Sequence, residues 1–210
     1  MRISFIVGGI TLIILGILGF GIYKVMQNPP GQAILSQPIN ASDHILGNPS
    51  TAKISLVEYG DYQCPACGFF HPIVKQLLQE YGDRMVFAYR HFPLPQHRNA
   101  AEAAYAAEAA GKQAQYWEMH DMLFEHQKDW ETASDPTNIF NGYAEQLGLD
   151  LAKFKTDATS GEVRSRIQAD TQSGKNSGVD STPSFFLNGA YIRPQSHEHF
   201  KQLIESALNS

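Results

Sequence analysis

The chain has 210 residues, enough for one domain with a hydrophobic core and little more. It is 43% hydrophobic and 18% charged, and its formal net charge of −5 lacks the basic excess of nucleic-acid-binding proteins, so nucleic acid is not expected as a partner. Two cysteines are too few for a four-cysteine zinc site or for a scaffold of several disulfides.

The N-terminal segment from Ile3 to Tyr23 carries no charge over 21 residues and is flanked by Arg2 and Lys24. About 20 helical residues span the hydrocarbon core of a bilayer, so we expect residues 1–26 to form an N-terminal membrane anchor with one transmembrane helix. The alternative is a cleaved signal peptide. Its apolar stretch is usually ~7–15 residues long and is followed by a small-residue cleavage site, which is not visible here.

The folded domain is expected at residues 51–210, because residues 27–50 are rich in Pro, Asn, Ser and Gly and predict a linker. KISLVEY, at 53–59, is rich in β-branched and apolar residues and predicts a buried strand. A helix is predicted over 65–81, with proline at its first position. RMVFAYR, at 84–90, predicts a second strand. The order strand–helix–strand is typical of an α/β fold with parallel strands.

The pattern then becomes helical from about residue 97 to residue 176, beginning with the alanine-rich stretch AEAAYAAEAAGK. Strand character returns at 184–187. Asn188-Gly189 predicts a tight hairpin turn into a return strand, and a last amphipathic helix follows. This order predicts a thioredoxin-type sheet interrupted by a helical insertion at about 97–176.

Both cysteines lie in the stretch EYGDYQCPACGFFHP, as Cys64 and Cys67 with Pro-Ala between them. A c-type haem site is excluded, because Gly68 rather than histidine follows the second cysteine. A structural disulfide across two residues would close a tiny loop and remove little entropy from the unfolded chain. A zinc or copper site needs more ligands, and the nearest histidine, His71, is expected to be solvated on the helix surface. A redox-active pair remains.

The position of the pair favours redox chemistry. Cys64 directly precedes the first helical position, where unpaired backbone N–H groups and the helix dipole stabilise a thiolate. Such a position lowers the pKa of a thiol from ~8.5 to about 3.5–7.5. Cys67 lies one turn further along the helix and is expected to be less exposed. We therefore expect Cys64 to be the sulfur that exchanges with a partner and Cys67 to be the resolving thiol.

Four stretches, VEYGDYQCPAC, YRHFPLP, YWEMHDMLF and GVDSTPSFFLNG, together resemble the DsbA-like thiol:disulfide oxidoreductases of bacteria, particularly membrane-anchored or single-domain members. The resemblance covers residues 51–210. It implies a thioredoxin fold with a helical insertion, and it implies that the Cys64–Cys67 disulfide carries the electrons without a cofactor. Thr182 and Pro183 resemble the family's cis-proline loop, which packs against the disulfide and binds substrate backbone.

The resemblance also assigns a role to Glu58, six residues before the first cysteine. Its same-parity neighbours Ile54 and Leu56 are apolar, and carboxylates are rarely buried without a partner. The position matches a buried acid of the family that relays protons to and from the second thiol, and burial would raise its pKa. The alternative is a glutamate at the edge of the strand that reaches water.

The resemblance implies an enzyme, a protein thiol:disulfide oxidoreductase that introduces disulfides into extracytoplasmic proteins. We expect a membrane-anchored monomer whose catalytic domain lies outside the cytoplasmic membrane. Thiol-containing folding proteins would be its substrates, and a membrane redox partner would reoxidise it. A disulfide reductase or isomerase of the same fold, or a thioredoxin-fold copper-binding module, are the alternatives. The dipeptide between the cysteines is Pro-Ala in place of Pro-His, which predicts a pair less oxidising than DsbA. The reduction potential of DsbA is about −120 mV.

Overall fold

The computed structural model describes residues 33–210. The predicted membrane anchor lies outside these residues. Within the described part of the chain, no helix is both long and apolar enough to cross a membrane.

Five strands form one mixed sheet in the order β1-β3-β2-β4-β5. The central pair, β2 and β3, is parallel, whereas β1 pairs with β3, β4 with β2, and β5 with β4, each in antiparallel orientation. Their bounds are β1 His44–Leu46, β2 Ile54–Gly60, β3 Met85–His91, β4 Ser184–Leu187 and β5 Ala190–Ile192. This is the sheet of a thioredoxin fold, as the sequence predicts.

The crossover between the parallel strands is α2, Pro65–Tyr81, followed by the short 3-10 turn η1, Gly82–Arg84. A hydrophobic core covers each face of β2, so all of its residues except Ser55 are buried, including Glu58. Proline occupies the start of α2, where a missing backbone N–H removes no hydrogen bond.

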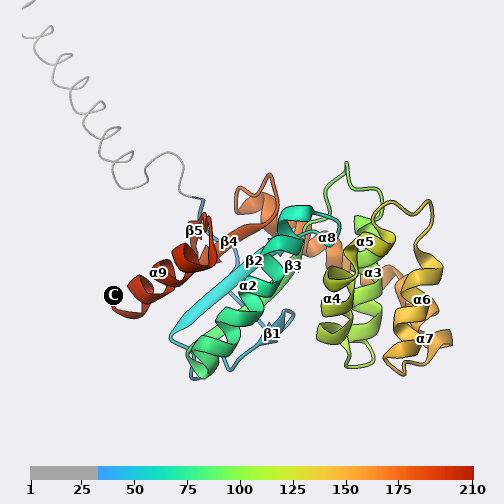
Figure 1. Ribbon diagram of the computed structural model, residues 1–210, viewed down its shortest axis with the longest axis horizontal. Helices are drawn as coiled ribbons and strands as arrows, with labels where there is room; N and C mark the ends of the chain where they lie inside the picture. The colour runs from blue at the N-terminus through green and yellow to red at the C-terminus, as the bar shows by residue number, and fades with distance from the viewer. Residues whose placement is uncertain (1–32) are drawn as a thin grey trace, which may run out of the picture. The chain divides into compact units, whose positions relative to one another are not determined.

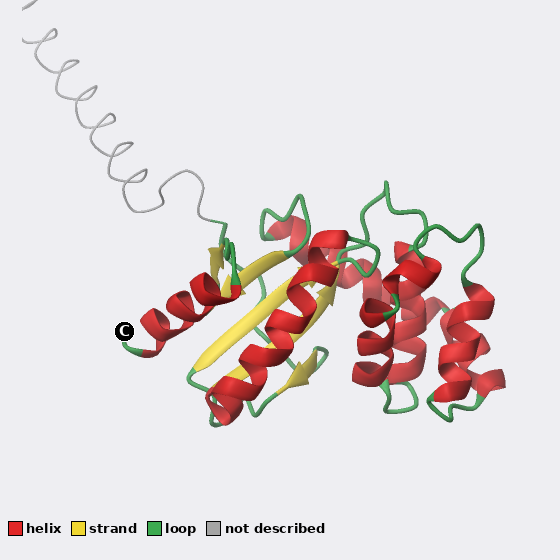
Figure 2. Ribbon diagram, in the orientation of Figure 1, coloured by secondary structure: helices red, strands yellow, loops and turns green. Residues whose placement is uncertain are grey.

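A block of helices separates β3 from β4 and lies beside the sheet, at the right in Figures 1 and 2. The helix that follows β3 packs closely on two later helices of the block, and the final helix of the block packs against β3 and returns the chain to the sheet. The helices are α3 Ala100–Gly111, α4 Tyr116–Glu125, α5 Gln127–Trp130, α6 Thr137–Gln146, α7 Leu151–Ala158 and α8 Gly161–Asn176. The final helix of the chain, α9 His197–Leu208, follows the β4–β5 hairpin.

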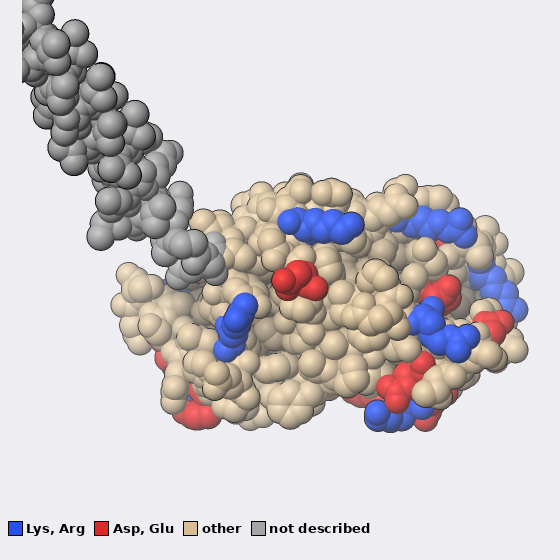
Figure 3. Space-filling model, turned by 90° about the horizontal axis from the view of Figure 1, so that it is seen from above, with Lys and Arg blue, Asp and Glu red and all other residues tan. Residues whose placement is uncertain are grey.

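The two faces of the sheet bury different cores. Successive side chains of a strand point to opposite faces, so Leu56 packs with α2, α9 and the insertion, whereas Val57 packs on the other side. Tyr59 also belongs to this second core, where its hydroxyl lies 2.8 Å from Ser173 Oγ of α8. On the face shown in Figure 3, charged side chains of both signs are scattered among uncharged residues.

The prediction of a linker over 27–50 is wrong for residues 33–50, which are part of the domain. β1 pairs with β3, and Ile34 forms an isolated bridge with Ala190 of β5. The buried guanidinium of Arg90 donates to both carboxylate oxygens of Asp43, at 2.8 and 2.9 Å, and to the carbonyls of residues 37 and 38. A three-residue strand among turn-forming residues has too few positions to show a periodic pattern, so the sequence did not reveal it.

Candidate active site

The cysteine pair lies where β2 turns into α2. Gly60 ends β2, and a Cβ at this position would lie 2.4 Å from the ring of Tyr89, so a larger residue would displace that ring. Cys64 is the N-cap of α2 with an extended backbone, φ −71° and ψ 122°, and its carbonyl accepts the backbone N–H of Gly68 at 3.1 Å. The chain therefore presents the first sulfur at the start of the helix, as predicted.

Cys64 has the chemistry of a stabilised thiolate. Its Sγ lies 3.3 Å from the carbonyl oxygen of Thr182, which accepts a hydrogen bond from Cys64 when that thiol is protonated. The pKa of Cys64 is lowered to about 5, first by the hydrogen bond from the Cys67 thiol, and then by Thr182 and by the backbone N–H groups of Cys67 and Ala66. Burial opposes these effects without overcoming them. Thiolate is therefore the main form of Cys64 at neutral pH.

Cys67 has the opposite character. It is completely buried, whereas Cys64 is 7% exposed. Burial raises the pKa of Cys67 well above its ordinary value, and the hydrogen bond to Cys64 and the charge of Glu58 act in the same direction. Both cysteines are free thiols, so the structure represents the reduced form. The two sulfurs are thus unequal, one ionised near the surface and one protonated in the core.

The loop before β4 covers the first sulfur. The Thr182–Pro183 peptide bond is cis, which agrees with the cis-proline loop that the resemblance implies. The Thr182 hydroxyl is buried and has no hydrogen-bond partner among residues 33–210. An O–H group left free in this position can donate to a thiolate, consistent with the lowering of the Cys64 pKa by Thr182.

Glu58 lies on β2 on the same face as Leu56, opposite Tyr89 of β3 and Phe185 of β4. It is 4% exposed, so the alternative of a strand-edge glutamate in water does not hold. Burial, followed by the charge of Cys64, raises its pKa from 4.5 to about 8. The structure therefore brings a largely protonated carboxylic acid to the buried end of the cysteine pair.

The loop that carries the pair is held by a buried aspartate that the sequence analysis did not single out. Asp61 Oδ1 accepts the backbone N–H of Gln63 at 2.7 Å, and Oδ2 accepts that of Leu94 at 2.8 Å and lies 2.7 Å from His97 Nδ1. The contact with Gln63 is an Asx-turn, which Asp favours two residues before the bonded N–H. The sequence GDYQ carries that signal, but the contacts with residues 94 and 97 cannot be read from it.

The insertion also reaches the pair, through Gln127 of α5. The side-chain amide of Gln127 donates to the carbonyls of Tyr62 at 2.7 Å and Cys64 at 3.0 Å. A residue more than 60 positions away thus completes the hydrogen bonding of the loop.

His71 of α2 is buried at 7% exposure, so the expectation that it is a solvated surface histidine is wrong.

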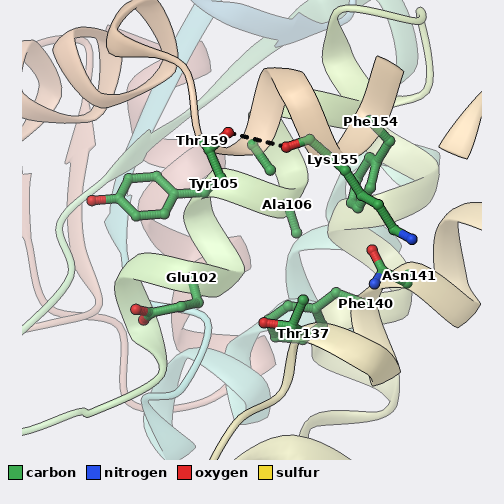
Figure 4. A pocket seen from close by; sticks show the side chains of 10 residues that line it. Glu102, Tyr105, Ala106, Thr137, Phe140, Asn141, Phe154, Lys155 and Thr159 are labelled. Carbon is green, nitrogen blue, oxygen red and sulfur yellow. Dashed lines mark hydrogen bonds between the residues drawn. The ribbon is translucent and has the colours of Figure 1, made fainter. Parts of the chain in front are cut away.

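A separate hollow of about 190 Å³ lies within the insertion and not at the cysteines (Figure 4). Phe140 of α6 and Phe154 of α7 line it together with Tyr105 of α3, and none of the predicted site residues belongs to it. The Thr159 hydroxyl at its rim donates to the carbonyl of Lys155. The cysteine pair therefore lies apart from this hollow, just after the C-terminal end of the central strand β2.

A family model described as Thioredoxin matches residues 40–206, and the chain belongs to this thioredoxin family. Two solved structures share 23% identity with it. Oxidised BdbD from Bacillus subtilis has a TM-score of 0.74, covering 86% of this chain and all of that one. α-DsbA1 from Wolbachia pipientis has a TM-score of 0.72, covering 83% and 94%. A thioredoxin-like oxidoreductase from Silicibacter pomeroyi is 24% identical, with a TM-score of 0.68, covering 81% and 95%. The fold is therefore that of DsbA-type thiol-disulfide oxidoreductases.

The curated relatives are much longer proteins. Na(+)/H(+) antiporter NhaA 1 of Salinispora arenicola is 42% identical over 148 residues, which are 70% of this chain and 22% of the antiporter. NhaA 3 of Salinispora tropica is 40% identical over 170 residues, 80% of this chain and 25% of the antiporter. The chain thus spans about a quarter of these relatives. Because the thioredoxin match occupies most of the chain, most of each aligned stretch lies within it.

Proposed function

We propose that this protein is a thiol:disulfide oxidoreductase that introduces disulfides into extracytoplasmic proteins. The observation that carries the proposal is the opposite shift of the two thiol pKa values, lowered at Cys64 and raised at Cys67. A thiolate that is stabilised in the reduced form makes the disulfide a better oxidant, because reduction of the disulfide produces that stabilised thiolate. A purely structural disulfide has no need of such an asymmetry.

The proposed reaction begins with the oxidised pair. A substrate thiolate attacks Cys64 Sγ, the Cys64–Cys67 bond breaks, and Cys67 leaves with the electron pair. Glu58, protonated because its pKa is about 8, supplies the proton that the buried Cys67 sulfur needs. The second substrate thiolate then attacks the substrate sulfur of the mixed disulfide and expels Cys64 as a stable thiolate. The substrate is oxidised by two electrons and the pair is reduced by two.

The direction follows from the leaving groups. A thiol of low pKa leaves faster in thiol–disulfide exchange, so expulsion of Cys64 from the mixed disulfide is favoured over attack of the Cys64 thiolate on the oxidised substrate. A membrane redox partner would reoxidise the pair, and no cofactor is required. The domain would act on the outer side of the cytoplasmic membrane, as a monomer held by the membrane anchor that the sequence predicts. Recovery of the native chain in the pellet after alkaline carbonate extraction would support the anchor, and a shortened soluble chain would contradict it.

The antiporter names do not change this proposal. The chain matches about a quarter of each antiporter, and that quarter is a thioredoxin-type region. Sodium–proton exchange is therefore not carried over to this chain.

The reduction potential of the pair tests the proposal. Equilibration with glutathione redox buffers should give a value between about −230 and −120 mV, above that of thioredoxin at about −270 mV. A value at or below that of thioredoxin would contradict the oxidase and support a reductase. Stoichiometric copper in protein purified under reducing conditions would instead support the copper-binding alternative.

A further inference from the structure

Three potential metal ligands meet between α2 and α4, outside the redox chemistry described above. His71 comes from α2, and His120 and Asp121 are neighbours on α4. Their ligand atoms all lie within 4.8 Å of one another. Two imidazoles and one carboxylate form a ligand set that zinc and related divalent metals use in proteins.

His71 has an unsatisfied nitrogen that points to this cluster. Its side chain is 6% exposed, and its Nε2 lies 3.3 Å from Asp121 Oδ1. The geometry of that contact is not a hydrogen bond, and Nε2 has no other partner among residues 33–210. Leaving a buried polar nitrogen without a partner destabilises the folded protein. A metal ion between the nitrogen and the carboxylate would satisfy it.

His120 is oriented by a residue behind it. Its Nδ1 lies 3.0 Å from the Tyr62 hydroxyl, and its ring packs against Tyr89 and Phe124. Metal-binding histidines are commonly held through their second ring nitrogen in this way. Burial lowers the pKa of both His71 and His120, which keeps the imidazoles neutral, as metal ligation requires.

We propose that His71 Nε2, His120 Nε2 and Asp121 Oδ1 bind one divalent transition-metal ion, Zn²⁺ being the ion whose ligand preferences the set matches. Bonds of about 2.0–2.1 Å place tetrahedral ligands roughly 3.3–3.4 Å apart, the separation already found between His71 and Asp121. Small rotations of the side chains close the remaining gap. Three protein ligands leave the fourth position to water.

Two further charges face the cluster and set its affinity. Lys75 of α2 lies 2.7 Å from Asp121 Oδ2 and 2.9 Å from Glu125 Oε1. Its ammonium group repels an incoming cation, but it leaves Asp121 Oδ1 free. A surface hollow lined by Lys75, Glu125 and Phe124 reaches His71 and gives the ion a path from solvent. Removing the lysine charge should therefore tighten metal binding.

The bound ion would join the helix of the cysteine pair to the insertion. His71 is one turn after Cys67 on α2, whereas the other two ligands lie on α4. The metal site does not depend on the direction of the redox reaction. In the oxidised protein the cysteines form a disulfide and have no thiolate that could bind the ion, so metal binding by this form tests the three ligands alone.

Zn²⁺ titration of the oxidised full chain, without a histidine tag and in detergent, tests the site by calorimetry. We expect one Zn²⁺ per chain. Asp121→Asn keeps the contact with Lys75 but removes the anionic ligand, and His71→Gln removes a ligand from the other helix. Each should weaken binding about tenfold or more, and Lys75→Met should strengthen it several-fold. His126→Gln is the matched control, because His126 forms an exposed pair with Asp129 at 3.2 Å.

Circular dichroism establishes that each variant is folded, and a rise in melting temperature with Zn²⁺ gives a second readout. That rise should be present in the wild type and in His126→Gln and absent from Asp121→Asn. No binding by the oxidised wild type would overturn the proposal, as would binding that Asp121→Asn and His71→Gln leave unchanged. Weaker binding in Lys75→Met would also contradict it.

Discussion

At the scale of single residues, the unequal cysteines determine what each can do. Replacing Cys67 with Ala leaves a Cys64 thiolate that captures a partner but has no intramolecular thiol to release it. Mixed disulfides with substrate proteins should then accumulate on non-reducing gels. Cys64→Ala should trap few of them, because Cys67 is completely buried and its pKa is raised.

Iodoacetamide titration of Cys67→Ala should give an apparent thiol pKa well below ~8.5. The pKa of Cys64 in this variant should also lie above the value of about 5 in the unaltered protein. The hydrogen bond from Cys67, which is the largest cause of the lowering, is lost. Equal trapping by the two variants, or an unshifted thiol in Cys67→Ala, would show that the pair is not an asymmetric redox site.

A second prediction at this scale concerns the effect of Glu58 on stability at different pH values. Its pKa is about 8 in the folded protein against 4.5 when exposed, so the folded state holds the proton more tightly. The cost of the buried carboxylate is absent below pH 4.5 and grows as the pH rises toward 8. Glu58→Gln removes this titration and should stabilise the oxidised protein by ~1–3 kcal/mol at pH 8, with little effect at pH 4.5.

Urea unfolding across pH measures this effect, and the exposed Glu102→Gln is the control. Single-turnover kinetics should show slower release of the mixed disulfide in Glu58→Gln, with the fold unchanged, because Cys67 loses its proton partner. An unchanged rate and pH profile would leave Glu58 with a structural role alone.

At the scale of elements, α5 is held to the start of α2 by one side chain. Gln127 donates to two carbonyls in the loop of the cysteine pair. Gln127→Ala leaves the buried Tyr62 carbonyl without this donor, and we expect a loss of about 1–3 kcal/mol in the free energy of unfolding. Gln113 bonds the Asp150 carbonyl at the surface, so Gln113→Ala should cost ~0.5 kcal/mol or less. Equal losses in the two variants would show that the buried contact has no special weight.

The sequence predicted these elements where the pattern was long and local. The strand at 53–59 is β2, the helix at 65–81 is α2, and Asn188-Gly189 forms the hairpin turn with positive φ at both residues. A buried strand, a proline-started helix and an Asn-Gly turn each carry their signal within a few residues.

The features that the sequence did not predict depend on contacts between distant residues. β1 has three residues and is held by pairing with β3 and by Arg90. His71 is buried because α4 packs against α2, and no periodicity of α2 alone shows that. The cysteines and Glu58 were found from motif and parity, whereas Gln127 is joined to its partners only by the fold.

At the scale of the whole molecule, the redox state should change stability with pH. The folded pKa of Cys64, about 5, lies below its ordinary value of 9.0, so its contribution to the reduced form is complete above pH 9 and is lost as the pH falls through 5. The Cys64 charge raises the pKa of Glu58 in the reduced form alone, so the comparison isolates the cysteines when both redox states also carry Glu58→Gln. The reduced protein should melt higher than the oxidised protein at pH 7.5, and the gap should shrink at pH 4.5.

Paired thermal melts of the two forms measure this gap, with the double Cys→Ala variant as a reference that has no redox state. An oxidised form that melts clearly higher at pH 7.5 would contradict an oxidising role, because the disulfide would then act as a stabilising cross-link.

The fastening of the N-terminal segment has a mechanical consequence. A pull on the chain ahead of residue 33 first meets the hydrogen bond from Tyr191 N to Ala33 O, at 3.1 Å, and then the one from Leu35 N to Gly189 O, at 2.9 Å. Further along the chain it must withdraw Asp43 from the buried guanidinium of Arg90, which costs more than breaking a surface ion pair because it leaves a buried charge without its partner. Tension on the leading segment is thus borne by the sheet before it reaches β2, and the spacing of the two sulfurs is insulated from it.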